Sequence, residues 1–156
     1  VASPVAVPGM IIVPSAKNGP VLALRPNGEG DITDTKAAYH WTRNSNTPDV
    51  PSPLVVDDIV YLCRENGVLI AVDVATGKEI YQERVHLTRH RASPVYADGH
   101  VYLVARDGTV NVIAAGREFK IVSTIKMGEE VSASPAISNG RIYLRSFDAL
   151  YAIGKE

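Results

Sequence analysis

The sequence has a single cysteine, no excess of either charge and no long apolar run. One cysteine, Cys63, excludes an internal disulfide and a CxxC metal site, and leaves the redox compartment open. Lys and Arg number 16 against 17 Asp and Glu, so there is no overall basic field to attract nucleic acid or anionic lipid. No apolar stretch approaches the ~20 residues of a membrane span. We therefore expect a globular protein with no nucleic-acid partner and no membrane span.

A helical hydrophobic period is also missing, which predicts essentially no helix. The sequence instead contains short runs of Val, Ile and Tyr punctuated by Gly with Asn or Asp, a pattern typical of strands and hairpins. The apolar N-terminal stretch lacks a basic leader and carries three prolines within residues 1–14, so it is interpreted as strand and turn rather than a signal peptide.

A four-fold internal repeat organises these strands. It begins at a Ser-Pro step, and successive steps are 49, 41 and 41 residues apart. A turn residue follows five positions after each proline, and a β-branched residue or Tyr follows eight positions after it. The Ser-Pro steps are Ser3-Pro4, Ser52-Pro53, Ser93-Pro94 and Ser134-Pro135; the eighth positions are Ile12, Tyr61, Tyr102 and Tyr143. A second turn is predicted at Asn18-Gly19, Asn66-Gly67, Asp107-Gly108 and Asp148-Ala149.

A period of about 40 to 50 residues with four strands is typical of a β-propeller blade, whereas the coils of a β-solenoid are shorter. Fourth strands are expected at 37–43, 78–85 and 119–127, with Trp41 as a blade-packing aromatic. The sequence thus predicts an all-β fold, with propeller blades of four antiparallel strands in one partial ring over 1–156. The expected repeats are 1–50, 51–91, 92–132 and 133–156, and the last lacks its fourth strand.

The repeat resembles that of the PQQ-like (pyrroloquinoline-quinone-like) propeller family of bacteria. The resemblance rests on the recurring Ser-Pro, Asp-Gly and Val-Tyr steps and on one full Ala-x-Asp-x-x-Thr-Gly-Lys motif. That motif comprises Ala71, Asp73, Thr76, Gly77 and Lys78; it is reduced to Ala-Ala-Gly at 114–116 and replaced by an insertion after Pro26. Many members of the family are exported, so the resemblance implies an exported or periplasmic location.

Quinone dehydrogenases of this family use an adjacent Cys-Cys pair, a metal held by Glu, Asn and Asp, and an Asp base. The resemblance carries none of these residues onto this chain, so no catalytic or metal-ligating residue is predicted, and PQQ would require a complete ring. The preferred function is a non-catalytic scaffold that presents loops to a protein or peptide. The alternatives are part of a quinone-dependent or other small-molecule enzyme whose active residues lie elsewhere, and a structural accessory domain.

Loops that enter the innermost strands form the ligand-binding end of many propellers. Here the loop at 86–94 has a cationic cluster that could bind an anion or an acidic partner, although Glu129 and Glu130 on the next loop offset it. Arg145 replaces an apolar residue of its repeat position, so it is expected to face the channel or to pair with an acid. The candidate binding residues are His86, Arg89, His90, Arg91 and Arg145.

Four blades leave a usual ring incomplete. The sequence opens on an innermost strand and ends after a third strand, which favours the C-terminal half of a longer chain. Two apolar blade faces and one strand edge would then be uncovered. We expect the remaining blades, or a second copy of the chain, to close the ring.

Overall fold

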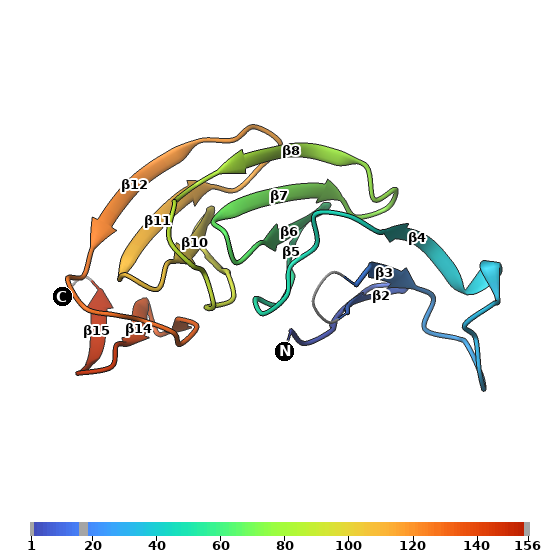
Figure 1. Cartoon of the computed structure of the whole chain (residues 1–156), viewed down its shortest axis with the longest axis horizontal. Coiled ribbons are helices and arrows are strands. Elements are labelled where there is room, and N and C mark those ends of the chain that lie inside the picture. The colour runs from blue at the N-terminus through green and yellow to red at the C-terminus, as the bar shows by residue number, and fades with distance from the viewer. Residues whose placement is uncertain (1, 16–18, 155–156) are drawn as a thin grey trace.

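The computed structural model describes residues 2–15 and 19–154 as four antiparallel sheets, here called blades 1 to 4, side by side along an arch (Figure 1). Blade 1 contains β1 (Val5–Val7), β2 (Met10–Pro14), β3 (Val21–Leu24) and β4 (Tyr39–Arg43). Blade 2 contains β5 (Leu54–Val56), β6 (Ile59–Cys63), β7 (Val68–Asp73) and β8 (Glu79–Arg84). Blade 3 contains β9 (Val95–Ala97), β10 (His100–Val104), β11 (Thr109–Ala114) and β12 (Ile121–Lys126). Blade 4 contains β13 (Ala136–Ser138), β14 (Arg141–Arg145) and β15 (Leu150–Gly154).

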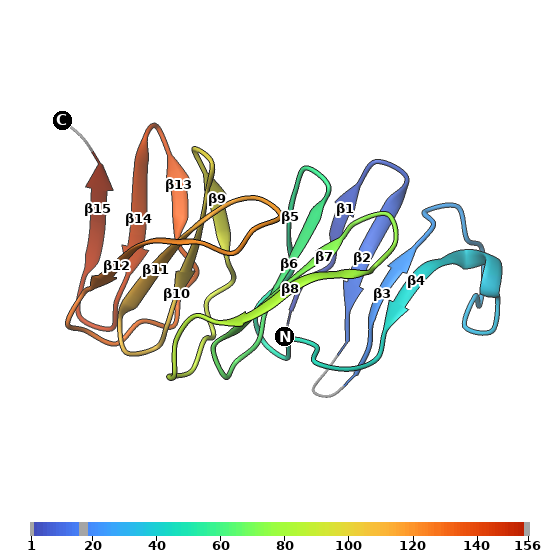
Figure 2. The same ribbon diagram turned by 90° about the horizontal axis from the view of Figure 1, so that it is seen from above.

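Strands follow one another within each blade in sequence order, each paired antiparallel to the next. The short first strands contact their counterparts in the neighbouring blades, β1 with β5, β5 with β9 and β9 with β13. The outer strands β4, β8 and β12 follow the convex side of the arch, and the blades stand side by side when seen from above (Figures 1 and 2). This arrangement is an open β-propeller, and it confirms the predicted fold class.

Two details differ from the sequence-based expectation. The outer strands are two or three residues shorter than predicted, and each pairs with the third strand through a register shift of the β-bulge type. The insertion in blade 1 contains one turn of 3-10 helix, η1 (Lys36–Ala38). Asn18 of the first predicted turn, and Val1 and Lys155–Glu156 at the ends of the predicted domain, lie outside the described residues.

The predicted hairpin turns are present after the first strands. Asp98-Gly99 and Asn139-Gly140 all have positive φ, between 48° and 75°. Two consecutive positive φ values are typical of the type I′ turn, which matches the twist of a two-residue hairpin. The Ser-Pro steps precede these strands directly, so the missing proline N–H costs no ladder hydrogen bond.

Apolar side chains from facing blades form the core. Trp41 of β4 packs on the β7–β8 turn of blade 2, where its indole N–H donates a 2.8 Å hydrogen bond to the Val74 carbonyl. Tyr61 is fully buried between blades 2 and 3, and its hydroxyl accepts a 2.8 Å hydrogen bond from the Gly116 N–H. Both aromatic residues act as the predicted inter-blade packing, with their polar atoms bonded to the next blade.

A ladder of serines joins the blades at the inner strands. The Ser3 N–H donates to the Ser52 hydroxyl at 2.9 Å, the Ser52 N–H to the Ser93 hydroxyl at 2.9 Å, and the Ser93 N–H to the Ser134 hydroxyl at 2.8 Å. We call Ser3, Ser52, Ser93 and Ser134 the serine ladder. The Ser-Pro step therefore has two roles, since the proline starts the inner strand and the serine links it to the next blade.

Ion pairs add links on the solvent side. Arg117 of blade 3 contacts the carboxylates of Asp58 and Asp73, both in blade 2. Arg43 of blade 1 donates to Glu79 of blade 2 at 2.8 Å. Asp73 also accepts hydrogen bonds from the Thr76 hydroxyl and N–H, and these bonds, opposed by desolvation and assisted by Arg117, lower the pKa of its carboxyl group. The Asp-x-x-Thr-Gly motif thus builds a turn that holds its neighbours.

Candidate loop-face binding site

The loops that enter the inner strands and the turns between second and third strands lie beside one another on the same side of the blades. We call this surface the loop face and define it by the loops at 44–53, 85–94 and 127–135 and the turns at 64–67, 105–108 and 146–149. Backbone hydrogen bonds join them: His90 N–H to the Glu65 carbonyl, Arg106 N–H to the Arg89 carbonyl, Val131 N–H to the Arg106 carbonyl and Phe147 N–H to the Glu130 carbonyl, at 2.7–3.0 Å. The loop face is therefore one continuous surface across blades 2 to 4.

Two glycines allow the loops to lie this close to the turns. A Cβ on Gly67 would lie 2.1 Å from the His86 carbonyl oxygen, and one on Gly108 would lie 2.1 Å from that of Glu129. Both glycines also have φ near +80°, a conformation that other residues rarely adopt. The loops that enter the inner strands thus pack directly against the glycines of the Asn-Gly and Asp-Gly turns.

His90 supports the loop face from inside. Its side chain is fully buried, and because its Nδ1 contacts the Thr88 carbonyl at 3.1 Å, Nδ1 carries the proton. Its Nε2 is buried without a hydrogen-bond partner among the described residues. Burial disfavours the imidazolium and lowers the pKa of His90, although the Thr88 carbonyl opposes that shift. His90 is therefore a core residue whose side chain is closed to solvent in this structure.

His86 is half-buried and pairs with Asp107 of blade 3, with 2.8 Å between Nε2 and the carboxylate. Desolvation alone would raise the pKa of Asp107, but hydrogen bonds from His86 and Thr109 outweigh it and lower the pKa to about 2. The pair links the loop at 85–94 to the turn of the next blade. His86 is therefore committed to an internal contact.

Three candidate arginines remain in solvent, two on the loop face and one beside it at the end of β14. Arg89 and Arg91 are exposed and pair with no carboxylate among the described residues. Arg145 is also exposed, and its Nε–H donates to the Ser146 carbonyl at 2.8 Å. Arg106 between them contacts Glu130 at 3.6 Å. Of the five candidates from the sequence, the three arginines are exposed to solvent, whereas His90 is buried and His86 is held by Asp107.

Two apolar side chains that the sequence analysis did not single out share the same surface. Leu87 is 81% exposed in the loop between blades 2 and 3, and Phe147 is 59% exposed in the last turn of blade 4. Phe147 and Arg145 line one shallow cavity of about 320 Å³ together with Ser132, Ala133 and Ser146. The repeat alignment contained a signal for Phe147, because Glu65 and Arg106 occupy the same position in the other blades.

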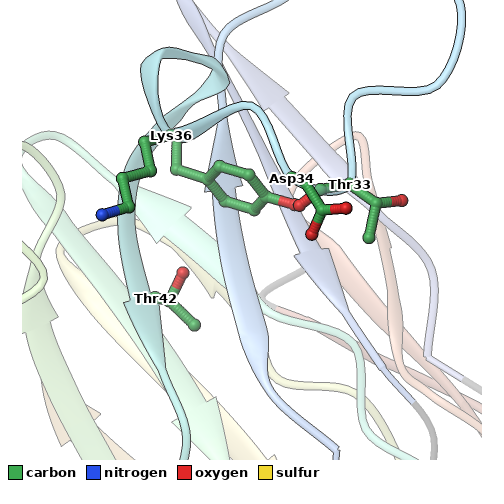
Figure 3. Close-up of a pocket in the computed structure, with 5 residues that line it drawn as sticks. Thr33, Asp34, Lys36 and Thr42 are labelled. Atoms are coloured by element: carbon green, nitrogen blue, oxygen red, sulfur yellow. The ribbon is translucent and has the colours of Figure 1, made fainter.

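The insertion in blade 1 forms a separate depression of about 400 Å³ on the outer side of the arch (Figure 3). Tyr39 forms part of its wall and donates a 3.0 Å hydrogen bond to the Thr33 carbonyl. The labelled side chains of Thr33, Asp34, Lys36 and Thr42 surround it and are exposed to solvent. With no buried polar group in its lining, this depression offers little basis for selecting a ligand.

Quinone chemistry cannot be assigned to these residues. The sequence contains one cysteine, so the adjacent cysteine pair is lacking. Over residues 2–15 and 19–154, no group of three or more His, Cys, Asp and Glu side chains is placed to hold a metal ion. The described residues therefore do not match the donor set of the quinone dehydrogenases. In the same described ranges, no helix is long and apolar enough to span a bilayer.

The repeat and the open ring of blades define the class as a PQQ-like β-propeller module. The family model described as outer membrane protein assembly factor BamB matches residues 28–118, which is more than half of the sequence. The chain belongs to this family, which confirms the resemblance seen in the sequence. No curated protein matches the chain significantly.

Solved structures show the same fold. BamB from Moraxella catarrhalis superposes with a TM-score of 0.73 and 17% identity, over 97% of this chain and 41% of that one. The computationally designed Ika4 protein gives 0.74 and 13%, over 98% and 91%. A europium-containing methanol dehydrogenase gives 0.60 and 18%, over 82% and 24%. The chain thus spans less than half of the BamB structure that it matches.

Proposed function

We propose that this chain is a non-catalytic binding module whose loop face receives a protein segment bearing acidic and apolar side chains. The observation that carries the proposal is the combination of exposed Arg89 and Arg91 with the exposed apolar side chains of Leu87 and Phe147 on one surface. Guanidinium groups bind carboxylates in bidentate geometry, and arginine and aromatic residues are enriched where proteins bind each other. The loop face offers both kinds of contact, and Arg89 and Arg91 pair with no carboxylate among the described residues.

The family supports a protein partner and a location outside the cytoplasm. The matching family is described as an outer membrane protein assembly factor, and such a factor handles other proteins. By analogy, we place this chain in the periplasm as part of the proposal. The alternatives are a contribution to a quinone-dependent or other small-molecule enzyme, for which PQQ would need a complete ring, and a structural accessory role.

The proposal also includes completion of the ring by further propeller blades. The outer edge of β15 pairs with no fourth strand among the described residues, and the two end blades each present an uncovered face. A fixed ring would hold the loops of blades 2 to 4 in one orientation, and this rigidity reduces the entropy cost of binding.

Binding to a labelled peptide tests the proposal. The probe is a fluorescein-labelled peptide in which Asp and Glu alternate with Phe and Leu, and the readout is fluorescence anisotropy. The variant Arg89→Glu/Arg91→Glu is expected to weaken binding at least tenfold, about 1.4 kcal/mol. The control Lys36→Glu/Lys120→Glu makes the same change in net charge away from the loop face. Equal weakening by both variants, or no binding by the unmodified chain, would contradict the proposal.

A further inference from the structure

The two ends of the serine ladder are complementary and unpaired. Ser134 accepts a hydrogen bond from Ser93, but within the described part of the chain its own N–H has no partner. Ser3 donates to Ser52, but the Ser3 hydroxyl accepts no hydrogen bond from a described residue. A fifth rung would pair the Ser134 N–H with a hydroxyl placed as that of Ser3 is. One chain therefore carries both halves of the missing contact.

Blade 1 has an uncovered apolar face, whereas the equivalent face of blade 2 is buried. Ile11, Val13, Leu22 and Leu24 are half-exposed on the outward-facing side of blade 1. Strand register equates them with Val60, Leu62, Ile70 and Val72 of blade 2. All four of those counterparts have zero exposure, because they pack against blade 1. The outward side of blade 1 therefore has the apolar pattern of a face that normally receives a preceding blade.

The opposite end shows the reverse pattern. Tyr143, Arg145, Leu150 and Ala152 lie on the outward side of blade 4, where Leu150 is 67% exposed. Their counterparts in blade 2 are Tyr61, Cys63, Leu69 and Ala71. Those counterparts have zero exposure, because blade 3 covers them. Blade 4 thus presents a face that normally receives a following blade.

The total accessible surface area of the chain is larger than that of a compact monomer, as two uncovered blade faces would require. The accessible surface is 8647 Å², about 1,000 Å² more than the roughly 7,650 Å² expected for a compact monomer of this mass. A standard interface buries about 800 Å² per partner. The excess is thus of the size needed for a specific contact.

We infer that two copies of this chain close head to tail, blade 4 of each against blade 1 of the other. The inference specifies the ring completion proposed above; of the five candidate binding residues it involves only Arg145, which lies at the end of β14 and outside the loop face. Two four-bladed arches give eight blades, within the range of closed propellers. At each of two identical joints, the Ser134 N–H of one copy donates to the Ser3 hydroxyl of the other, and Leu150 is covered by the face that contains Leu22.

Light scattering after size exclusion tests the inference on the full chain. The unmodified protein is expected at about 33.6 kDa, twice the 16.8 kDa of one chain. Leu22→Glu and Leu150→Glu should each give a monomer, whereas Val122→Glu, on the exposed outer strand β12, should stay dimeric. Arg89→Glu/Arg91→Glu should also stay dimeric, so that loss of peptide binding and loss of closure are separate results. Circular dichroism establishes that each variant is folded.

Mixing the two monomeric variants distinguishes head-to-tail closure from other modes. A pair formed by the Leu22→Glu and Leu150→Glu chains has one joint with no substitution, so equimolar mixing should restore a dimer. Ser3→Ala removes one hydrogen bond from each joint and should raise the dimer dissociation constant about 5- to 150-fold. A monomeric unmodified chain at 100 µM, or no dimer on mixing, would overturn the inference.

Discussion

Replacing Gly77 by alanine should destabilise the protein through a specific contact with Trp41. The Ala Cβ would lie 2.6 Å from the indole ring, and the residue has φ +68°. The left-handed conformation costs a non-glycine residue about 1–2 kcal/mol. Overpacking against the ring adds about 1–3 kcal/mol. The free energy of unfolding should therefore fall by about 2–5 kcal/mol.

Gly99 provides the matched control, because it has φ +75° but no atom within 4 Å of a Cβ. Gly99→Ala should show only the conformational cost. Urea unfolding followed by circular dichroism at one protein concentration measures both variants. In a Trp41→Ala background, Gly77→Ala should also show only the conformational cost, which gives a coupling of about 1–3 kcal/mol. Equal destabilisation by Gly77→Ala and Gly99→Ala in the wild-type background would contradict the packing of Trp41 against Gly77.

Three further predictions follow from buried or bridging groups. Burial lowers the pKa of His90, so as the pH falls the imidazole is protonated in the unfolded chain before it is protonated in the folded one. The contribution of His90 to the free energy of unfolding should be fully present above pH 6.5 and should fall below it, by at most about 1.4 kcal/mol per pH unit. The urea midpoint should therefore differ less between pH 7.5 and 5.5 in His90→Gln than in the unmodified protein. Burial raises the pKa of the Cys63 thiol to about 12, so a thiol reagent should modify it only in urea, and rapid modification of the folded protein would contradict its burial. Arg117→Ala should cost about 0.5–1 kcal/mol at low salt and less at 1 M salt, because the Arg117 and Asp58 side chains are exposed to solvent; a cost independent of salt would argue against the ion pairs.

The sequence predicted the features that depend on local chemistry. Ser-Pro spacing and Asp-Gly turns indicated the blades, and the role of Trp41 followed from its place in an outer strand. The serine ladder was not predicted, because a hydrogen bond between residues 41 apart depends on how neighbouring blades are aligned. The ion pairs of Arg117 with Asp58 and Asp73 were not predicted for the same reason. The Asp at position 58, where the other repeats have glycine, was the one sequence signal for them.

The candidate site was predicted less completely than the fold. The sequence predicted one cationic cluster in the loop at 86–94. In the structure the two arginines of this loop are exposed, whereas its two histidines are buried or half-buried. His90 lies in the core because the loop crosses the turn at Gly67, and His86 is held by Asp107. Which loop residues face inward depends on these crossings between blades, and a single sequence does not show them.

Two copies of the open four-bladed arch are expected to close into one ring through their complementary end blades. Negative-stain electron microscopy of the purified chain, at a concentration where dimers are expected, tests this directly. Class averages should show closed rings of eight radial blades around a channel. Isolated four-bladed arcs, or open chains of arcs that never close, would contradict it.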